Sequence, residues 1–214
     1  MSDRPITEHR LGRMREVLER RQLSLAVVLE NVHDRHNASA VIRSCDAFGV
    51  GAMHMLYTEE AFPLVADGVA GHARRWLDFE RWDNRVAIAA ALRERGMAFY
   101  ATAPGPGAVP HTDVDWTKPA AIALGNENRG CSDELLALAD ARVWVPMRGM
   151  VESLNVSVAA AIVLAEAARQ REAAGMYEPR WDDERERALG AWLARERREL
   201  PSAVDDRAED RDEI

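Results

Sequence analysis

The 214-residue chain is short of the residues that build disulfide frameworks, metal centres and membrane spans. It has only two cysteines, Cys45 and Cys131, without metal-ligand spacing, and so few thiols are typical of a reducing compartment. No apolar run reaches the roughly 18 residues that a membrane span needs. The opening MSDRPITEHR lacks the charged-then-apolar pattern of a secretion signal. We therefore expect a cytoplasmic protein with no metal and no membrane partner.

Three common catalytic motifs are also missing. The sequence has no GxGxxG, which disfavours the usual dinucleotide enzymes, and no GxxxxGK[ST], which disfavours a phosphate-cradling P-loop. It has no GxSxG either, so a serine hydrolase would have to build its triad from Ser44 or Ser153 with a distant histidine. The chemistry must be sought in other residues.

Lysine is nearly absent, and the charge is unevenly spread. Lys118 is the only lysine among 28 basic residues, and the formal net charge is −8. Residues 1–22 hold six Arg and four acidic residues, a net of +2, whereas residues 178–214 hold eight Arg and thirteen acidic residues, a net of −5. Most of the acidity is therefore in the tail, where it need not face an anionic partner. The basic start is either a phosphate-contacting arm or a solvated helix face.

What the chain does have is an alternation of apolar strand-like runs and helical segments. We expect strands at 23–30, 52–57, 97–103, 119–125 and 141–147, and helices at 38–49, 84–95, 132–140 and 153–172. The helix at 38–49 should end at Gly49 in a C-cap position, and Ser132 or Asp133 should cap the helix at 132–140. Such alternation predicts an α/β fold with a largely parallel sheet flanked by helices.

The composition divides the chain into four segments. Residues 1–22 are expected to form an Arg-rich N-terminal helical arm and residues 23–175 the α/β domain. Residues 176–200 should form a charged C-terminal helical extension, and residues 201–214 an acidic, disordered tail.

Three polar clusters each follow an expected strand. They are NVHDRHNASAVIRS, GNENRGCS and MRGMVESLN. Because ligands of open α/β sheets gather at the carboxyl ends of the strands, these clusters should share one site. They are rich in Asn and Gly and lack an evident nucleophile–base pair, which indicates a site that binds and orients. The last cluster leads into a helix whose start carries Ser153, Asn155 and Ser157, although a helix cap needs only one such residue.

These segments also carry a family resemblance. HNASAVIRSCDAFGV, ALGNENRGCS and VPMRGMVESLNVSVAAAIVLAEAARQR resemble, in order and spacing, the three motifs of the SpoU branch of the SPOUT RNA 2′-O-ribose methyltransferases. The likeness covers roughly residues 10–178. It is greatest to the members that methylate guanosine 18 of tRNA, because of the Arg-rich first helix ending in RRQ, the lack of an added RNA-binding domain, and the AGMY segment.

The resemblance implies a fold, a cofactor and partners. The sheet should end in a C-terminal deep trefoil knot, and the protein should be a homodimer that binds S-adenosylmethionine near the subunit interface and acts on tRNA. The residues implied in cofactor binding are Thr102, Leu124, Gly125, Asn126, Val145, Met147 and Leu154. The residues implied in catalysis are Asn37, Arg43, Glu127, Ser153 and Asn155. The residues expected to contact RNA are Arg10, Arg13, Arg20, Arg21, His36 and Arg74.

Some roles stay open at this point. Arg43 matches the arginine that the family is proposed to use to activate the 2′-hydroxyl, but an arginine is a poor base and can instead stabilise the developing alkoxide. Asn37 can orient Arg43 or the ribose, or cap a helix, and Glu127 is expected to orient rather than to act as a base. Glu152 stands where relatives often have Gln, and Asp34 where they often carry a basic residue. The alternatives are methylation of another tRNA nucleotide or of ribosomal RNA, and a non-catalytic RNA-binding module.

Overall fold

The structure is a computed structural model that describes residues 6–60 and 75–199. Arg74 and the expected acidic tail at 201–214 lie outside the described residues. The chain divides into two compact units, one of residues 20–178 and one that combines residues 1–19 with 179–214. The larger unit contains the sheet and is described first.

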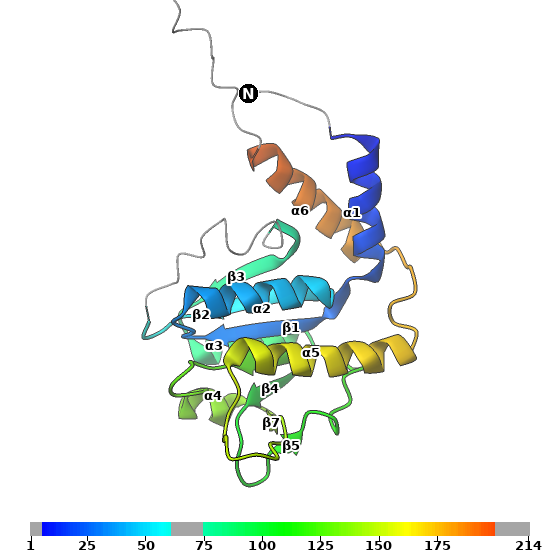
Figure 1. Ribbon diagram of the computed structural model, residues 1–214. Helices are drawn as coiled ribbons and strands as arrows, with labels where there is room; N and C mark the ends of the chain where they lie inside the picture. Colours follow the sequence, from blue (N-terminus) through cyan, green and yellow to red (C-terminus); the bar gives the residue numbers. More distant parts are fainter. Residues whose placement is uncertain (1–5, 61–74, 200–214) are drawn as a thin grey trace, which may run out of the picture. The chain divides into compact units, whose positions relative to one another are not determined.

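Seven strands of the described chain form one sheet, in the order β3-β2-β1-β6-β4-β7-β5 (Figure 1). Every pair of neighbouring strands is parallel, so the predicted α/β fold with a parallel sheet is confirmed. The strands are β1 (Gln22–Glu30), β2 (Val50–Leu56), β3 (Asp78–Trp82), β4 (Ala98–Thr102), β5 (Val109–Pro110), β6 (Ala120–Leu124) and β7 (Ala141–Trp144).

The centre of the sheet is buried on both faces. All five residues of β6 are buried, and β1 alternates Leu25, Val27 and Leu29 on one face with Ala26 and Val28 on the other. Continuous apolar runs of this kind are typical of parallel strands that are covered by helices on both sides. The two faces accordingly belong to two separate hydrophobic clusters.

Two helices cover each face of the sheet. Helices α2 (Arg35–Ala47) and α5 (Val156–Ala173) contribute to one cluster, while α3 (Arg85–Glu94) and α4 (Asp133–Leu138) contribute to the other (Figure 1). The caps follow the sequence closely: Asn84, Ser132 and Asn155 are the N-cap residues of α3, α4 and α5. Gly49 directly follows Phe48, the C-cap residue of α2, and its φ is +71°. This left-handed conformation is the usual one for a glycine at the end of a helix.

Two helix starts differ from the sequence-based prediction. Helix α2 begins at Arg35 rather than at residue 38, because Asp34 is its N-cap and accepts a hydrogen bond from the His36 N–H at 2.7 Å. Asn37 is therefore inside the helix and does not cap it. Helix α5 begins at Val156 rather than at 153, so Ser153 precedes the helix.

Strands β3 and β5 were not predicted, since β3 is short and mostly polar and β5 has only two residues.

The smaller unit contains most of α1 (Glu8–Arg20) and all of α6 (Asp183–Glu199). The guanidinium of Arg10 makes two hydrogen bonds to the Glu196 carboxylate, at 2.8 and 2.7 Å. Arg185 is buried and donates from Nε to the Leu18 carbonyl at 3.0 Å. Met14 of α1 is buried as well. No helix within the described ranges is long and apolar enough to span a membrane.

Candidate functional site

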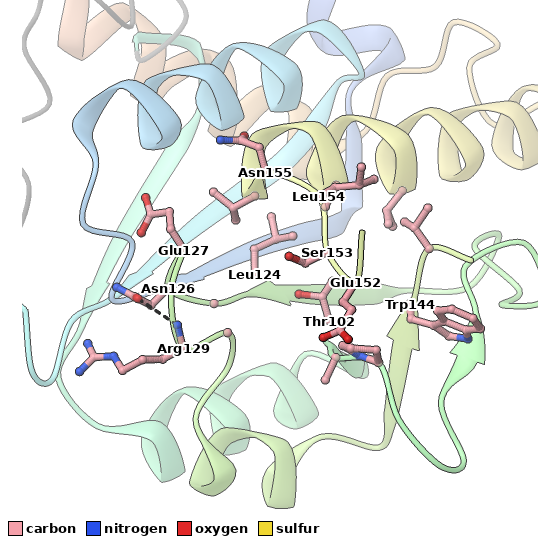
Figure 2. A pocket seen from close by; sticks show the side chains of 18 of the residues that line it. Thr102, Leu124, Asn126, Glu127, Arg129, Trp144, Glu152, Ser153, Leu154 and Asn155 are labelled. Atoms are coloured by element: carbon pink, nitrogen blue, oxygen red, sulfur yellow. Dashed lines mark hydrogen bonds between the residues drawn. The ribbon is translucent and has the colours of Figure 1, made fainter. Parts of the chain in front are cut away.

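A cavity of about 530 Å³ lies at the carboxyl ends of β4, β6 and β7, next to the start of α5 (Figure 2). Its wall combines the loop after β6, the segment between β7 and α5, and Asn37 of α2. All seven residues that the sequence nominated for cofactor binding line this cavity, namely Thr102, Leu124, Gly125, Asn126, Val145, Met147 and Leu154. The structure thus brings together residues that are widely separated along the chain.

Four of the five nominated catalytic residues also line the cavity. They are Asn37, Glu127, Ser153 and Asn155. Arg43 does not line it and lies on an exposed part of α2. Within the part of the chain that the structure describes, its guanidinium has no hydrogen-bond or ion-pair partner. Arg43 follows His36 by two helical turns, so the two side chains share one face of the helix.

Three of these residues form a chain of hydrogen bonds, which we call the amide–carboxylate chain. Asn155 Nδ2 donates to Asn37 Oδ1 at 3.0 Å, and Asn37 Nδ2 donates to Glu127 Oε1 at 2.9 Å. An ionised carboxylate can only accept, so Asn37 must turn its NH₂ group toward Glu127 and its carbonyl toward Asn155. Asn155 Oδ1 is then left to cap α5, where it accepts from the Ser157 N–H at 2.9 Å. These hydrogen bonds therefore both cap α5 and connect it to Asn37 of α2 and to Glu127 in the loop after β6.

Glu127 is held by backbone groups as well. Its Oε2 accepts from the His33 N–H and its Oε1 from the Asp34 N–H, both at 3.0 Å. Partial burial acts to raise the pKa of Glu127, but the hydrogen bonds from Asn37 and from backbone N–H groups outweigh it and hold that pKa below its usual 4.5. Glu127 is therefore ionised at neutral pH and already bound by three donors. This fits an orienting role and argues against a general base.

A buried asparagine that the sequence reasoning missed supports the loop after β6. Asn31 is 3% exposed and has φ +50°, a left-handed conformation that asparagine tolerates better than most residues. Its side-chain oxygen accepts from the Thr58 N–H at 2.9 Å, and its carbonyl accepts from Asn126 Nδ2 at 2.8 Å. Asn126 Oδ1 in turn accepts from the Asn128 and Arg129 N–H groups at 3.0 and 3.3 Å (Figure 2). The position of Asn31, directly after an apolar strand, was the available signal.

Gly125 permits the tight return of the same loop. A Cβ atom added there would lie 2.0 Å from the Gly130 carbonyl carbon and 2.1 Å from the Cys131 nitrogen. Asn126 and Gly130 also exchange two backbone hydrogen bonds, at 3.0 and 2.8 Å. The floor of the cavity is therefore a closely packed backbone that admits no side chain at position 125.

The segment between β7 and α5 differs from the loop after β6. Residues 148–153 are all exposed. No hydrogen bond or ion pair joins residues 147–154 to any other part of the chain that the structure covers. The Ser153 hydroxyl and the Glu152 carboxylate thus line the cavity without a protein partner in the described ranges (Figure 2). Arg129, Trp144 and Glu152 line the cavity too, although the sequence reasoning assigned them no role.

The residues expected to contact RNA differ in their surroundings. Arg21 is 2% exposed and donates to Asp46 Oδ1 at 2.8 Å, so it is unavailable to a phosphate and we withdraw it from the set. Arg10 and Arg13 are exposed but paired, with Glu196 and Glu16 respectively. Arg20 and His36 are exposed. Arg74 lies outside the described residues.

Within the described ranges, no group of three or more His, Cys, Asp or Glu side chains could hold a metal ion.

Comparison with known proteins gives consistent matches. The family model described as the SpoU rRNA Methylase family matches residues 24–165. A tRNA (guanosine(18)-2′-O)-methyltransferase of Thermus thermophilus is 46% identical over 189 residues, which cover 87% of this chain and 97% of that protein. The crystal structure of the A. aeolicus TrmH/SpoU tRNA modifying enzyme matches with a TM-score of 0.82 at 40% identity, covering 88% of this chain and 97% of the other.

A ligand-bound relative is among the structural matches. The AdoMet-bound rRNA methyltransferase of Sinorhizobium meliloti matches with a TM-score of 0.61 at 30% identity. The match covers 68% of this chain but only 56% of that protein.

Proposed function

The chain belongs to the SpoU methylase family, and we propose that it transfers the methyl group of S-adenosylmethionine to the ribose 2′-hydroxyl of guanosine 18 in tRNA. One observation carries the proposal: all seven residues expected to bind the cofactor and four of the five expected to act in catalysis, drawn from distant parts of the chain, line a single cavity at the carboxyl edge of the sheet. The resemblance to the guanosine-18 enzymes extends over nearly the whole length of the Thermus thermophilus protein.

The cavity fits the proposed methyl donor. Its volume of about 530 Å³ is within the range of roughly 300–1,000 Å³ that is usual for small-molecule sites. Leu124, Leu154 and Val156 offer apolar surface for an adenine ring, and Thr102 offers a hydroxyl group. Bound S-adenosylmethionine would supply an already activated methyl group, so the protein must mainly align the acceptor.

Arg43 is proposed to serve the acceptor oxygen. An arginine stays protonated at any physiological pH, which makes it a poor proton acceptor. Its guanidinium can instead stabilise the charge that develops on the 2′-oxygen while it holds a neighbouring phosphate. The lack of a protein partner for Arg43 within the described residues leaves its donors available for this purpose.

The amide–carboxylate chain is proposed to hold the site in register. Glu127 fixes Asn37, and Asn37 fixes Asn155 at the start of α5. Ser153 lies two residues before Asn155, on the segment that lines the opposite side of the cavity, and it is proposed to contact the ligand. These bonds thus hold the start of α2 and the start of α5 in fixed positions at the cavity.

The finer features of the family are carried over as proposals. We propose that the C-terminal part of the sheet unit forms the deep trefoil knot and that two copies form a homodimer with the sites near the interface. Three exposed apolar side chains near the cavity, Met150, Val151 and Val158, support the dimer, because such groups are usually covered in a partnered surface. We also keep residues 23–175 as the methyltransferase domain and residues 1–22 and 176–200 as helical extensions. Because its proposed substrate is tRNA, we also propose that the enzyme acts in the cytoplasm.

RNA contacts are proposed for Arg10, Arg13, Arg20 and His36. A phosphate would have to displace Glu196 from Arg10 and Glu16 from Arg13. Both ion pairs are at least partly exposed, and exposed pairs are worth no more than about 1 kcal/mol, so a phosphate can compete. Neutralising Arg10, Arg13 and Arg20 together should lower the salt dependence of tRNA binding by about one unit of slope per lost phosphate contact. An unchanged slope would mean that these arginines form a solvated helix face that does not contact RNA.

The activity is tested with a tRNA transcript and labelled S-adenosylmethionine. We expect one methyl group at guanosine 18 and none on a matched transcript that carries 2′-deoxyguanosine at this position. Arg43→Ala should lower the rate by about 100- to 1,000-fold, which is typical for the loss of one group that stabilises a developing oxyanion. Arg93→Ala, on a helix at the other face of the sheet, is the control and should keep the rate.

Other outcomes separate the alternatives. A methyl group on another tRNA nucleotide, or on ribosomal RNA only, would replace the proposed substrate but keep the chemistry. Equal background counts for the wild-type protein and Arg43→Ala would leave a non-catalytic RNA-binding module.

A further inference from the structure

Three charged side chains line the cavity, and two of them are already bound by other groups of the protein. They are Glu127, Arg129 and Glu152. Both oxygens of Glu127 accept hydrogen bonds, from the His33 and Asp34 N–H groups and from Asn37 Nδ2. A carboxylate with three donors around it is held in place and has little hydrogen-bonding capacity left for a ligand.

Arg129 is neutralised by two carboxylates from outside the cavity. Its NH2 atom lies 2.8 Å from Glu60 Oε1, and its NH1 atom lies 3.4 Å from Glu59 Oε2. Glu59 is shared with Arg85, whose NH2 atom lies 2.8 Å from Glu59 Oε1. The positive charge of Arg129 therefore belongs to this surface network and does not balance the cavity.

Glu152 is the remaining charge. It belongs to the exposed stretch 148–153, and no hydrogen bond or ion pair from any described residue reaches its carboxylate. Figure 2 shows it among the labelled side chains of the pocket, between Leu124 and Trp144 in that view. The wall of the cavity therefore carries one carboxylate that no described protein group compensates.

We propose that Glu152 makes the cavity selective for the charge of its ligand, favouring the sulfonium substrate over the neutral thioether product. The inference rests on the proposed function. In the transfer, the bond between the methyl carbon and the sulfonium sulfur breaks and its electron pair stays on sulfur. The methyl carbon bonds to the ribose oxygen, and the hydroxyl proton passes to water. The ligand thus loses one positive charge in the step, and a nearby carboxylate then holds it less strongly.

The expected size of the effect follows from exposure. Glu152 is exposed, so its attraction for a cation is screened by water and salt. Exposed charge pairs contribute up to about 1 kcal/mol, which corresponds to a preference of about fivefold. That is enough to help the product leave without making the substrate bind tightly.

The test compares Glu152→Gln with the wild-type protein by isothermal titration calorimetry. Each is titrated with S-adenosylmethionine, with S-adenosylhomocysteine, and with an analogue that carries a protonated amine in place of the sulfonium. We expect Glu152→Gln to bind S-adenosylmethionine and the amine analogue about fivefold more weakly and S-adenosylhomocysteine equally well. Glu134→Gln, an exposed residue of α4, is the control and should leave all three affinities unchanged.

Several results would overturn the proposal. Equal weakening of all three ligands would mean that Glu152 contacts the ammonium group that they share. Unchanged affinities would mean that its carboxylate does not act on the ligand, and a rise in tRNA affinity with unchanged ligand preference would assign it to the RNA. If the wild-type protein bound none of the three ligands, the proposed function would fail first. An unchanged melting temperature for Glu152→Gln confirms that the variant is folded.

Discussion

The two sides of the cavity are built in different ways. The side made by α2 and the loop after β6 is cross-linked by the amide–carboxylate chain, by Asn31 and by the tight turn at Gly125. The other side, residues 147–154, is exposed over residues 148–153 and has no hydrogen bond to any other described residue. Both sides come from motifs of equal prominence in the sequence, so the motif alone did not distinguish them.

This difference indicates that the two sides of the cavity have different functions. Ordering a binding segment costs affinity at the moment of binding, so a side that is already ordered provides geometry without this cost. A segment with few hydrogen bonds can open and close at low free energy, as ligand-binding loops often do. We therefore propose that the hydrogen-bonded side keeps the site in a fixed geometry and that the exposed side admits and releases the donor.

The largest expected difference concerns one glycine on each side. Gly125→Ala would place a Cβ about 2 Å from the backbone of Gly130 and Cys131, so the loop must move. We expect a loss of about 3 kcal/mol or more, which lowers the melting temperature by about 6 °C or more. Gly149→Ala has no atom within 4 Å of the new Cβ and should melt like the wild type. Thermal unfolding checks both, and equal melting temperatures would refute the contrast.

Next in size is the loss of the charge at the end of the amide–carboxylate chain. Glu127→Gln puts an NH₂ group among three donors, so at least one of them is left unsatisfied at a cost of about 1–2 kcal/mol. We expect a melting temperature about 3–6 °C lower and a rate of methyl transfer lower by about 100-fold, because Asn37 is no longer held in place. Glu134→Gln again serves as the control. A variant with normal rate would show that Glu127 does not orient the site.

The contribution of Glu127 to stability should change with pH in a direction that its pKa fixes. The pKa of Glu127 in the folded protein lies below its usual 4.5, so the unfolded chain binds the proton more readily. Its stabilising contribution is thus fully present above pH 4.5 and is lost as the pH falls through the folded pKa. The gap in melting temperature between the wild type and Glu127→Gln should be constant from pH 7 to pH 5 and narrow below pH 4.5. A gap that widens in acid would contradict this.

A smaller effect separates capping from bridging at Asn155. Asn155→Asp keeps the oxygen that caps α5 but loses the Nδ2 donor to Asn37, whereas Asn155→Ala loses both. We expect the alanine variant to lose about 1 kcal/mol of stability and the aspartate variant less than about half of that. Both should lose methyl-transfer activity. If only the alanine variant were slow, the bond to Asn37 would have no role beyond the cap.

The smallest effect on the free protein is expected at Ser153. Its hydroxyl has no partner among the described residues, so Ser153→Ala should change the stability by no more than about 0.5 kcal/mol. The difference should appear only with ligand. In the wild type, S-adenosylmethionine should slow amide hydrogen exchange in residues 148–154, and in Ser153→Ala this protection should be weaker. Protection that is already present without ligand would remove the contrast between the two sides.

The sequence predicted the sheet better than it predicted the site. Short apolar runs such as LAVVL in β1 and AAIAL in β6, bounded by polar or turn residues, favour a strand buried on both faces, and both strands are present. Strand β3 was missed because its alternation is mostly polar, and β5 because two residues leave no pattern. The start of α2 was placed too late because Arg35, His36 and Asn37 look like loop residues, and only the bond from the His36 N–H to Asp34 identifies the cap.

Within the site, family motifs identified the residues but not their bonds. That Glu127 holds Asn37, and Asn37 holds Asn155, depends on the close approach of three loops, which no local pattern reports. Asn31 was missed for the same reason, since its left-handed backbone and its bond to Asn126 exist only in the folded chain. Arg21 was misjudged because a basic residue at the end of an Arg-rich helix looks exposed in a sequence, yet it is buried against Asp46.

The strand order has a consequence for how the protein is made. Strand β6 lies between β1 and β4, but along the chain it follows both of them. While the ribosome is still producing the middle of the chain, β1 can pair with β2, yet its other edge stays open until β6 emerges. An open apolar edge invites pairing with other chains and recruits chaperones. The nascent polypeptide is therefore most vulnerable to aggregation between the emergence of its first strand and the emergence of β6, which completes the middle of the sheet.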